Sequence, residues 1–221
     1  MKQVIQLLIL LTFLSFSIPA KADIVPLSSK SINYYGIGVL NMPKSYNVYE
    51  NPDKNSKIIK QENNIIKKSS IVRSSGNKKM SYIAYVPSNN IALLAVDYDG
   101  GNHWYSVYTN QATGEKGWVY DENDSDFYTY REMFYKWGKP YGLRIFNDIN
   151  ESHKSLYSKE DLSSKAVSKL ELPKFTTFTI IRGNWMLATV QDLDKQPKVG
   201  WFNWRNEDGT LNMFPNFREQ R

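Results

Sequence analysis

Residues 101–119 read Gly-Asn-His-Trp-Tyr-Ser-Val-Tyr-Thr-Asn-Gln-Ala-Thr-Gly-Glu-Lys-Gly-Trp-Val, and the start and end of this stretch recur later in the chain. Gly183-Asn184-Trp185 repeats the beginning with one residue fewer before the tryptophan, and residues 200–202 (Gly-Trp-Phe) repeat the end. Bulky residues alternate on both sides of Thr113-Gly114, a dipeptide typical of a turn. The pattern predicts short antiparallel strands in both places.

The repeat continues towards the N-terminus of each copy. Residues 35–41 (Tyr-Gly-Ile-Gly-Val-Leu-Asn) match 141–147 (Tyr-Gly-Leu-Arg-Ile-Phe-Asn), and Val48-Tyr49 with residues 56–59 match Leu156-Tyr157 with residues 164–167. Four matched blocks in the same order predict two copies of one small domain, over residues 34–122 and 141–205. Residues 206–221 remain as a C-terminal tail.

Each copy has the local pattern of β-structure. Apolar runs such as residues 91–98 and 175–181 are short enough for buried strands, and turns rich in Gly or Asn close them. Short strands at intervals of about 8–12 residues are typical of small barrels or sandwiches. We therefore expect a mainly β protein.

An aromatic segment between the copies predicts a helix within residues 123–140. Spacings of three, four and three place Phe127, Tyr130, Phe134 and Trp137 on one helical face. The expected N-cap is Asp124 or Ser125, and Gly138 and Pro140 are expected to end the helix. Its aromatic face either packs the two copies together as a linker or binds a partner.

Each copy resembles the bacterial Src-homology-3-like (SH3-like) domains. The resemblance lies in the Val-Tyr or Leu-Tyr pair, the Ser-Lys pair with two following aliphatic residues, the Gly-Asn-(x)-Trp turn and the closing Gly-Trp pair. It implies two strongly bent small β-barrels, joined here by a short aromatic linker helix. It also implies binding of cell-wall peptides or envelope proteins rather than catalysis.

The first 22 residues predict a signal peptide that is cleaved after Ala22. Lys2 precedes an apolar run over residues 4–18, and Ala20-Lys21-Ala22 has the small-x-small pattern of a cleavage site. Cleavage removes two lysines and no acidic residue, so the net charge falls from +6 to +4. We expect a periplasmic or secreted protein with no remaining transmembrane anchor, for which nucleic acid is an improbable partner.

The first copy contains a basic insertion at about residues 57–90. Residues 54–79 carry eight Lys or Arg residues and one acidic residue, Glu62. Residues 74–77 (Ser-Ser-Gly-Asn) predict the turn of a hairpin. Lys67, Lys68, Lys78 and Lys79 on this hairpin either attract an anionic ligand or simply form a solvated loop.

Catalytic chemistry has little support in the composition. The chain has no Cys and two His residues, His103 and His153, both in polar turns, and it has no phosphate-binding loop or zinc-protease motif. We expect no enzymatic activity, no metal and no cofactor. The carboxylate pairs Asp97/Asp99 and Asp192/Asp194 leave a glycosidic hydrolase as a remote alternative.

Aromatic residues are the expected binding groups. We expect most of the matched tryptophans (Trp104, Trp118, Trp185 and Trp201) in the core, and their neighbours Tyr49, Tyr105, Tyr120, Phe202 and Trp204 in an outward aromatic groove for an extended peptide or glycan. The candidate ligand-binding residues are Tyr49, Trp104, Tyr105, Trp118, Tyr120, Trp185, Phe202, Trp204, Lys67, Lys68, Lys78 and Lys79. The predicted function is a non-enzymatic protein that binds peptidoglycan-type material. The alternative is a periplasmic adaptor or inhibitor that uses the basic hairpin and the linker helix.

Overall fold

The computed structural model describes residues 23–42, 45–62, 80–122, 126–170, 174–175, 177–191 and 196–217, and the fold is mainly β as predicted. The signal peptide and the basic hairpin lysines lie outside these residues. The first half contains β1(Gly38–Asn41), β2(Tyr46–Tyr49), β3(Ile58–Glu62), β4(Ala84–Val86), β5(Ile91–Gly101), β6(Trp104–Asn110), β7(Glu115–Tyr120) and β8(Phe127–Thr129). The second half contains β9(Leu143–Ile145), β10(Ser155–Tyr157), β11(Ala166–Lys169), β12(Lys174–Phe175), β13(Thr177–Arg182), β14(Trp185–Gln191), β15(Pro197–Asn203) and β16(Met213–Pro215).

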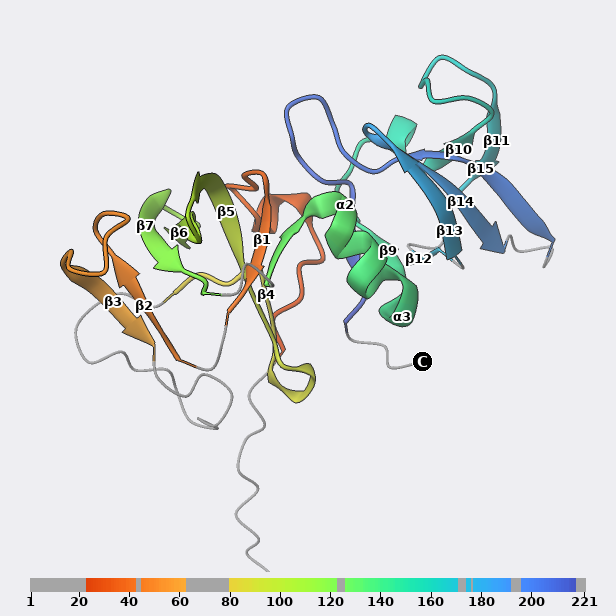
Figure 1. The fold of residues 1–221 in the computed structure, drawn as a ribbon. Helices are drawn as coiled ribbons and strands as arrows, with labels where there is room; N and C mark the ends of the chain where they lie inside the picture. The colour runs from red at the N-terminus through yellow and green to blue at the C-terminus, as the bar shows by residue number, and fades with distance from the viewer. Residues whose placement is uncertain are drawn as a thin grey trace, which may run out of the picture.

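The two halves have the same order of strands (Figure 1). The first sheet runs β3-β2-β7-β6-β5-β1-β8, with β4 added beside β5. In the second half one sheet runs β11-β10-β15-β14-β13, and a second runs β12-β9-β16. β12 and β13 are separated by one residue and together take the place of β5. Apart from β4, which has no counterpart among the described strands, the second half therefore follows the strand order of the first. Neither half forms a closed barrel through the pairings of its described strands.

The register repeats as well as the order. Tyr49 pairs with Trp118 in the first half, and Tyr157 pairs with Trp201 in the second. The strand of each tyrosine has a bulge immediately before it, between residues 48 and 49 and between residues 156 and 157. Trp118 and Trp201 therefore occupy equivalent register positions in the two halves.

The glycine of each Gly-Trp pair marks a close approach of two strands. A Cβ on Gly117 would lie 2.3 Å from Cγ1 of Val48, and one on Gly200 would lie 2.9 Å from Cβ of Leu156. Any side chain at these positions would force the strands apart, since packed interiors have little room for an extra methyl group. The Val-Tyr or Leu-Tyr pair and the distant Gly-Trp pair thus meet as one packing unit.

The turns that precede Trp104 and Trp185 explain why the Gly-Asn-(x)-Trp motif is one residue shorter in the second copy. In the first half Gly101 pairs with Trp104, and in the second Arg182 pairs with Trp185, so both loops contain two residues. Asn102 and His103 both have positive φ, at 48° and 67°, whereas the second loop places Gly183 at 49°. Since these residues fill the same two turn positions, Asn184 is the structural counterpart of His103.

The helix between the halves differs from its prediction at both ends. Phe127 lies in β8, and the helix begins with α2(Tyr130–Met133), capped by a reciprocal capping box between Thr129 and Glu132. It continues through a π-helical segment, η3(Phe134–Gly138), and through α3(Lys139–Tyr141). Gly138 and Pro140 therefore lie inside the helical stretch, and Gly142, at φ 75°, follows its last residue.

One hydrophobic core joins the halves through this helix. The helix lies between the two halves (Figure 1). Its residues Tyr130, Met133, Phe134 and Trp137 are buried in a cluster that includes residues of both halves. The segment expected as a C-terminal tail contributes β16 and the buried residues Leu211, Met213, Phe214 and Phe217. The aromatic face of the helix is therefore used inside the protein, as the linker interpretation requires.

The N-terminal segment is bound to the second half by one carboxylate. Asp148 accepts hydrogen bonds from Oγ of Ser28 (2.7 Å), from the backbone and hydroxyl of Ser29 (2.8 and 3.0 Å) and from the backbone of Lys30 (3.3 Å). Partial burial raises the pKa of Asp148, but these hydrogen bonds outweigh that effect and lower it from 3.8 to about 2.

Candidate ligand-binding sites

Three of the predicted aromatic residues form a cluster on the outer side of the first sheet. The ring centroids of Tyr49 and Trp104 lie 5.4 Å apart, and those of Trp104 and Tyr120 lie 5.2 Å apart, both in edge arrangements. Lys54 covers the cluster, with Nζ 3.6 Å from the centroid of the Tyr120 ring. None of the three rings belongs to the two hydrophobic core clusters.

A second aromatic pair extends this face. The ring of Trp118 lies against Gly100, where an added Cβ would come within 2.6 Å of it, and contacts the edge of Tyr98 at 6.4 Å. Tyr98 is 60% exposed. The first half therefore presents flat aromatic surface beside the Tyr49–Trp104–Tyr120 cluster.

The prediction of which residues face outward was wrong for three of the candidates. Tyr105, Phe202 and Trp204 are buried: Tyr105 stacks on Phe127, and Trp204 packs edge-on against Phe134. Their burial follows from strand alternation, because Gly117 and Gly200 point into the core, and their neighbours Trp118 and Trp201 then point out. Of the matched tryptophans, Trp104 is buried as expected, whereas Trp118, Trp185 and Trp201 are partly exposed, contrary to the expectation.

The second half has a tyrosine–tryptophan pair at the equivalent place, next to a cavity. The rings of Tyr157 and Trp185 lie 6.1 Å apart, edge to face. Beside Trp185 is a cavity of about 430 Å³. It is lined by His153, Glu160, Asp161, Leu162, Asn184, Trp185, Asn203, Asn206 and Glu207.

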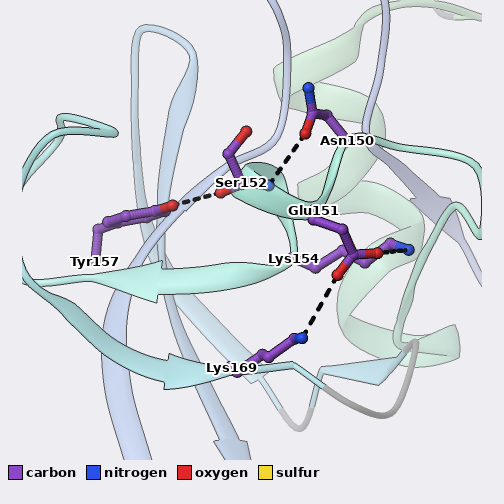
Figure 2. Close-up of polar contacts among 6 residues, drawn as sticks. All are labelled: Asn150, Glu151, Ser152, Lys154, Tyr157 and Lys169. Carbon is purple, nitrogen blue, oxygen red and sulfur yellow. Dashed lines mark hydrogen bonds and ion pairs between the residues drawn. The ribbon is translucent and has the colours of Figure 1, made fainter.

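A short turn carries His153 to the cavity. The turn η4(Glu151–His153) is capped by Asn150, whose side-chain oxygen accepts a hydrogen bond from the backbone of Ser152 (Figure 2). The Tyr157 hydroxyl donates to the carbonyl of Ser152, as Figure 2 also shows. The tyrosine that packs on Trp185 thus fixes the turn that forms another wall of the cavity.

Asparagine side chains connect the segments that meet at the cavity. His153 Nδ1 lies 2.9 Å from Oδ1 of Asn203, whose amide nitrogen donates to the carbonyl of Asn184 at 3.3 Å. Asn212, 1% exposed, donates to the backbone oxygen of Asn203 and to Oδ1 of Asn206, at 2.9 Å in each case. A buried, connected amide network holds its members in one geometry, so this side of the cavity is rigid.

The cavity is acidic although the chain as a whole is basic. Three carboxylates line it and no Lys or Arg does. Asp161 accepts hydrogen bonds from the backbone and hydroxyl of Ser163, which lower its pKa and keep it ionised at neutral pH. Glu160 pairs with Arg182 at 3.3 Å through one oxygen.

The neighbouring carboxylate of Glu151 does not add to the charge of the cavity. It forms ion pairs with Lys154 at 2.7 Å and Lys169 at 3.6 Å (Figure 2). Both lysines lower the pKa of Glu151, the hydrogen bond from Lys154 most of all.

Of the two candidate carboxylate pairs, only Asp97 and Asp99 lie among the described residues. Asp97 binds Lys116 Nζ at 2.7 Å and the Tyr108 hydroxyl at 2.5 Å; burial raises its pKa, but these bonds outweigh that effect and lower it. Asp192 and Asp194, like Lys67, Lys68, Lys78 and Lys79, lie outside the described residues. No group of three His, Asp or Glu side chains in the described part of the chain could hold a metal ion, and no described helix has the length and apolar character to cross a membrane.

Comparison with known proteins adds no relative. No protein-family model matches the chain, and no curated protein matches its sequence. The structure joins Tyr49, Trp104 and Tyr120 in one cluster and places Trp185 at the cavity. Sequence reasoning missed the remaining lining residues, because they come from four separate segments that share no motif.

Proposed function

We propose that the protein is a non-enzymatic, exported binding protein with two SH3-like modules, which recognises a peptide or peptidoglycan-type ligand. The proposal rests on one observation. In each half a tyrosine packs edge-on against the first matched tryptophan, Tyr49 against Trp104 and Tyr157 against Trp185. The same two tyrosines pair in equivalent register with Trp118 and Trp201, and Tyr49 and Trp185 are partly exposed. Partly exposed aromatic rings beside amide and carboxylate groups suit extended peptides and sugars, because flat apolar surface and fixed polar groups are combined.

The alternative role as an adaptor is less well supported. It would use the aromatic face of the linker helix, yet Met133 and Phe134 are fully buried and Trp137 is 7% exposed. Replacement of Phe134 would thus report on folding rather than on partner binding. The basic hairpin would have to carry the adaptor role alone.

The test is retention of the protein on purified peptidoglycan at low and high salt. Retention of the wild type, weakened by Trp185→Ala and by Tyr49→Ala, is the expected result. Ile24→Ala is the matched control, because Ile24 is a 43% exposed apolar residue that is far from both pairs in sequence and lies outside the strands that carry them. No retention at either salt concentration would overturn the wall-binding proposal.

A further inference from the structure

The loop that follows each tyrosine has the same backbone structure in both halves. Residues 50–57 are closed by a bond from Glu50 N to Lys57 O at 2.9 Å, and residues 158–165 by the equivalent bond at 3.0 Å. The side chains of Asp53 and Asp161 each accept a hydrogen bond from the backbone two residues later, at 2.9 and 2.8 Å. Residues that differ by 108 in number are therefore structurally equivalent, and Leu162 occupies the position of Lys54.

In the first half this position supplies a cation to the aromatic cluster. Lys54 Nζ lies 3.6 Å from the Tyr120 centroid, and Tyr120 packs on Trp104. An ammonium group over an aromatic face is attracted by the negative charge density of the ring. The chain thus binds one of its own lysines at this place.

At the equivalent position the second half has no cation, and a cavity lies there instead. Leu162 replaces Lys54, and Asn203, which pairs with Trp185, replaces Tyr120, which pairs with Trp104. The result is the 430 Å³ cavity, which is lined by Trp185 and by the carboxylates of Glu160, Asp161 and Glu207. One oxygen of Glu160 is paired with Arg182. Leu162 itself is 39% exposed, so it does not fill the space.

We propose that this cavity binds a lysine-type ammonium side chain of a partner peptide, as the intermolecular counterpart of the contact that Lys54 makes within the first half. The alkyl part of the ligand packs on Trp185 and Leu162, and the ammonium group lies among the carboxylates. The side-chain oxygens of Asn184 and Asn206, which also line the cavity, are the acceptors for its remaining N–H groups. This inference rests on the proposed function and adds the ligand chemistry of one site.

The test titrates the full-length protein with acetyl-Gly-Lys-Gly-amide and with its uncharged isostere acetyl-Gly-norleucine-Gly-amide. The indole N–H signal of Trp185 in NMR spectra, assigned with Trp185→Phe, reports binding. We expect the lysine peptide to bind at least about tenfold more tightly, because only its ammonium interacts with the carboxylates and the ring. Raising the salt concentration reduces this preference.

The decisive variant gives the second half the residue type that the first half has at the equivalent position, Lys54. Leu162→Lys places a cation where the first half has one, so it occupies the cavity and weakens binding of the lysine peptide by about tenfold or more. Leu162→Met is the matched neutral control and retains binding within about twofold. Leu162 is 39% exposed and lies on a surface loop, so both variants are expected to fold.

Two results would overturn the inference: equal binding of the two peptides, or unchanged binding by Leu162→Lys. Retention on peptidoglycan, measured with the same variants, separates the two proposals. If Leu162→Lys is retained like wild type and the lysine peptide leaves Trp185 unshifted, the cation site is wrong and wall binding stands. If the lysine peptide binds but peptidoglycan does not retain the protein, wall binding is wrong and the cation site stands.

Discussion

The first and second halves share the strand order and the tyrosine–tryptophan register, yet they differ in what covers the tryptophan. In the first half Tyr120, with Lys54 over its ring, packs against Trp104. In the second half Leu162 and Asn203 occupy the equivalent positions, and Trp185 lies beside a cavity. The residues that are the same or similar in the two halves lie where two strands approach closely, as Gly117 does to Val48 and Gly200 to Leu156. The comparison teaches that packing fixes the glycine and aliphatic positions, whereas the residues over the tryptophan are free to differ.

A second difference concerns the outer face near the hairpins. In the first half Tyr34 stacks on Tyr108 at 5.0 Å, and Lys116 lies beside the same ring. The equivalent positions in the second half are Thr189 and Val199, and Val199 is 53% exposed. The N-terminal segment thus covers one face of the first half, and the second half has no equivalent cover among the described residues.

The largest expected effect tests whether the halves are energetically one unit. Phe134→Ala removes a fully buried ring from the core that both halves share, and should lower the free energy of unfolding by about 3–5 kcal/mol. Urea unfolding followed by tryptophan fluorescence should show one transition at a lower midpoint. The control is Tyr98→Ala, expected within about 0.5 kcal/mol of wild type because Tyr98 is exposed. Two well-separated transitions in the wild type would contradict a shared core.

The next effect tests whether the Gly-Trp pairs have the same packing role. Gly117→Ala and Gly200→Ala should each destabilise the protein by about 1–3 kcal/mol, because the new methyl group collides with the neighbouring strand. An added Cβ would lie closer to the neighbouring strand at Gly117 (2.3 Å) than at Gly200 (2.9 Å), so Gly117→Ala should lose more stability. Val199→Ala, on the same strand as Gly200 but exposed, serves as control in the same unfolding assay. A loss in only one half would show that the repeat does not extend to packing.

A smaller effect is expected where the N-terminal segment meets the second half. Asp148 has a lowered pKa, about 2 instead of 3.8, so its contribution to stability is present above about pH 4 and is lost as the pH falls towards 2. Asp148→Asn should cost about 1 kcal/mol or less at neutral pH, since water competes for this partly exposed carboxylate. The gap in urea midpoint between variant and wild type should shrink at acid pH. A gap that does not depend on pH would contradict this interpretation.

The smallest effect compares the two loops directly. Lys54→Met removes the ammonium group from the Tyr120 ring and should cost about 0.5 kcal/mol, the value typical of exposed cation–π contacts. Leu162→Met, at the equivalent position, should leave stability unchanged because no cation is lost there. Equal losses in the two variants, measured by urea unfolding, would show that the Lys54 contact has no energetic role.

The sequence alone predicted the mainly β fold and the repeat, because the Gly-Trp and Tyr pairs are constrained by contact between strands. It misassigned the core face of several strands. Trp104 and Tyr105 are both buried, so alternation of size gave no indication of which one points inward. The useful signal was Gly117: a glycine that a neighbouring strand packs against marks the inner face, which places Trp118 outside.

The helix and the cavity show two other limits. Phe127 fits the helical spacing, but the capping box of Thr129 and Glu132 starts the helix after it, and that local signal was visible in the sequence. No such signal exists for the cavity. His153, Trp185 and Glu207 come from distant segments, and only the tertiary arrangement brings them together.

Backbone NMR of the full-length protein tests the repeated register most directly. In the first half we predict cross-strand contacts between Tyr49 and Trp118 and between Trp104 and Tyr120. In the second half we predict the equivalent contacts, between Tyr157 and Trp201 and between Trp185 and Asn203. The account would be contradicted by contacts present in one half and shifted by a residue in the other, because the two tryptophans would then face opposite sides.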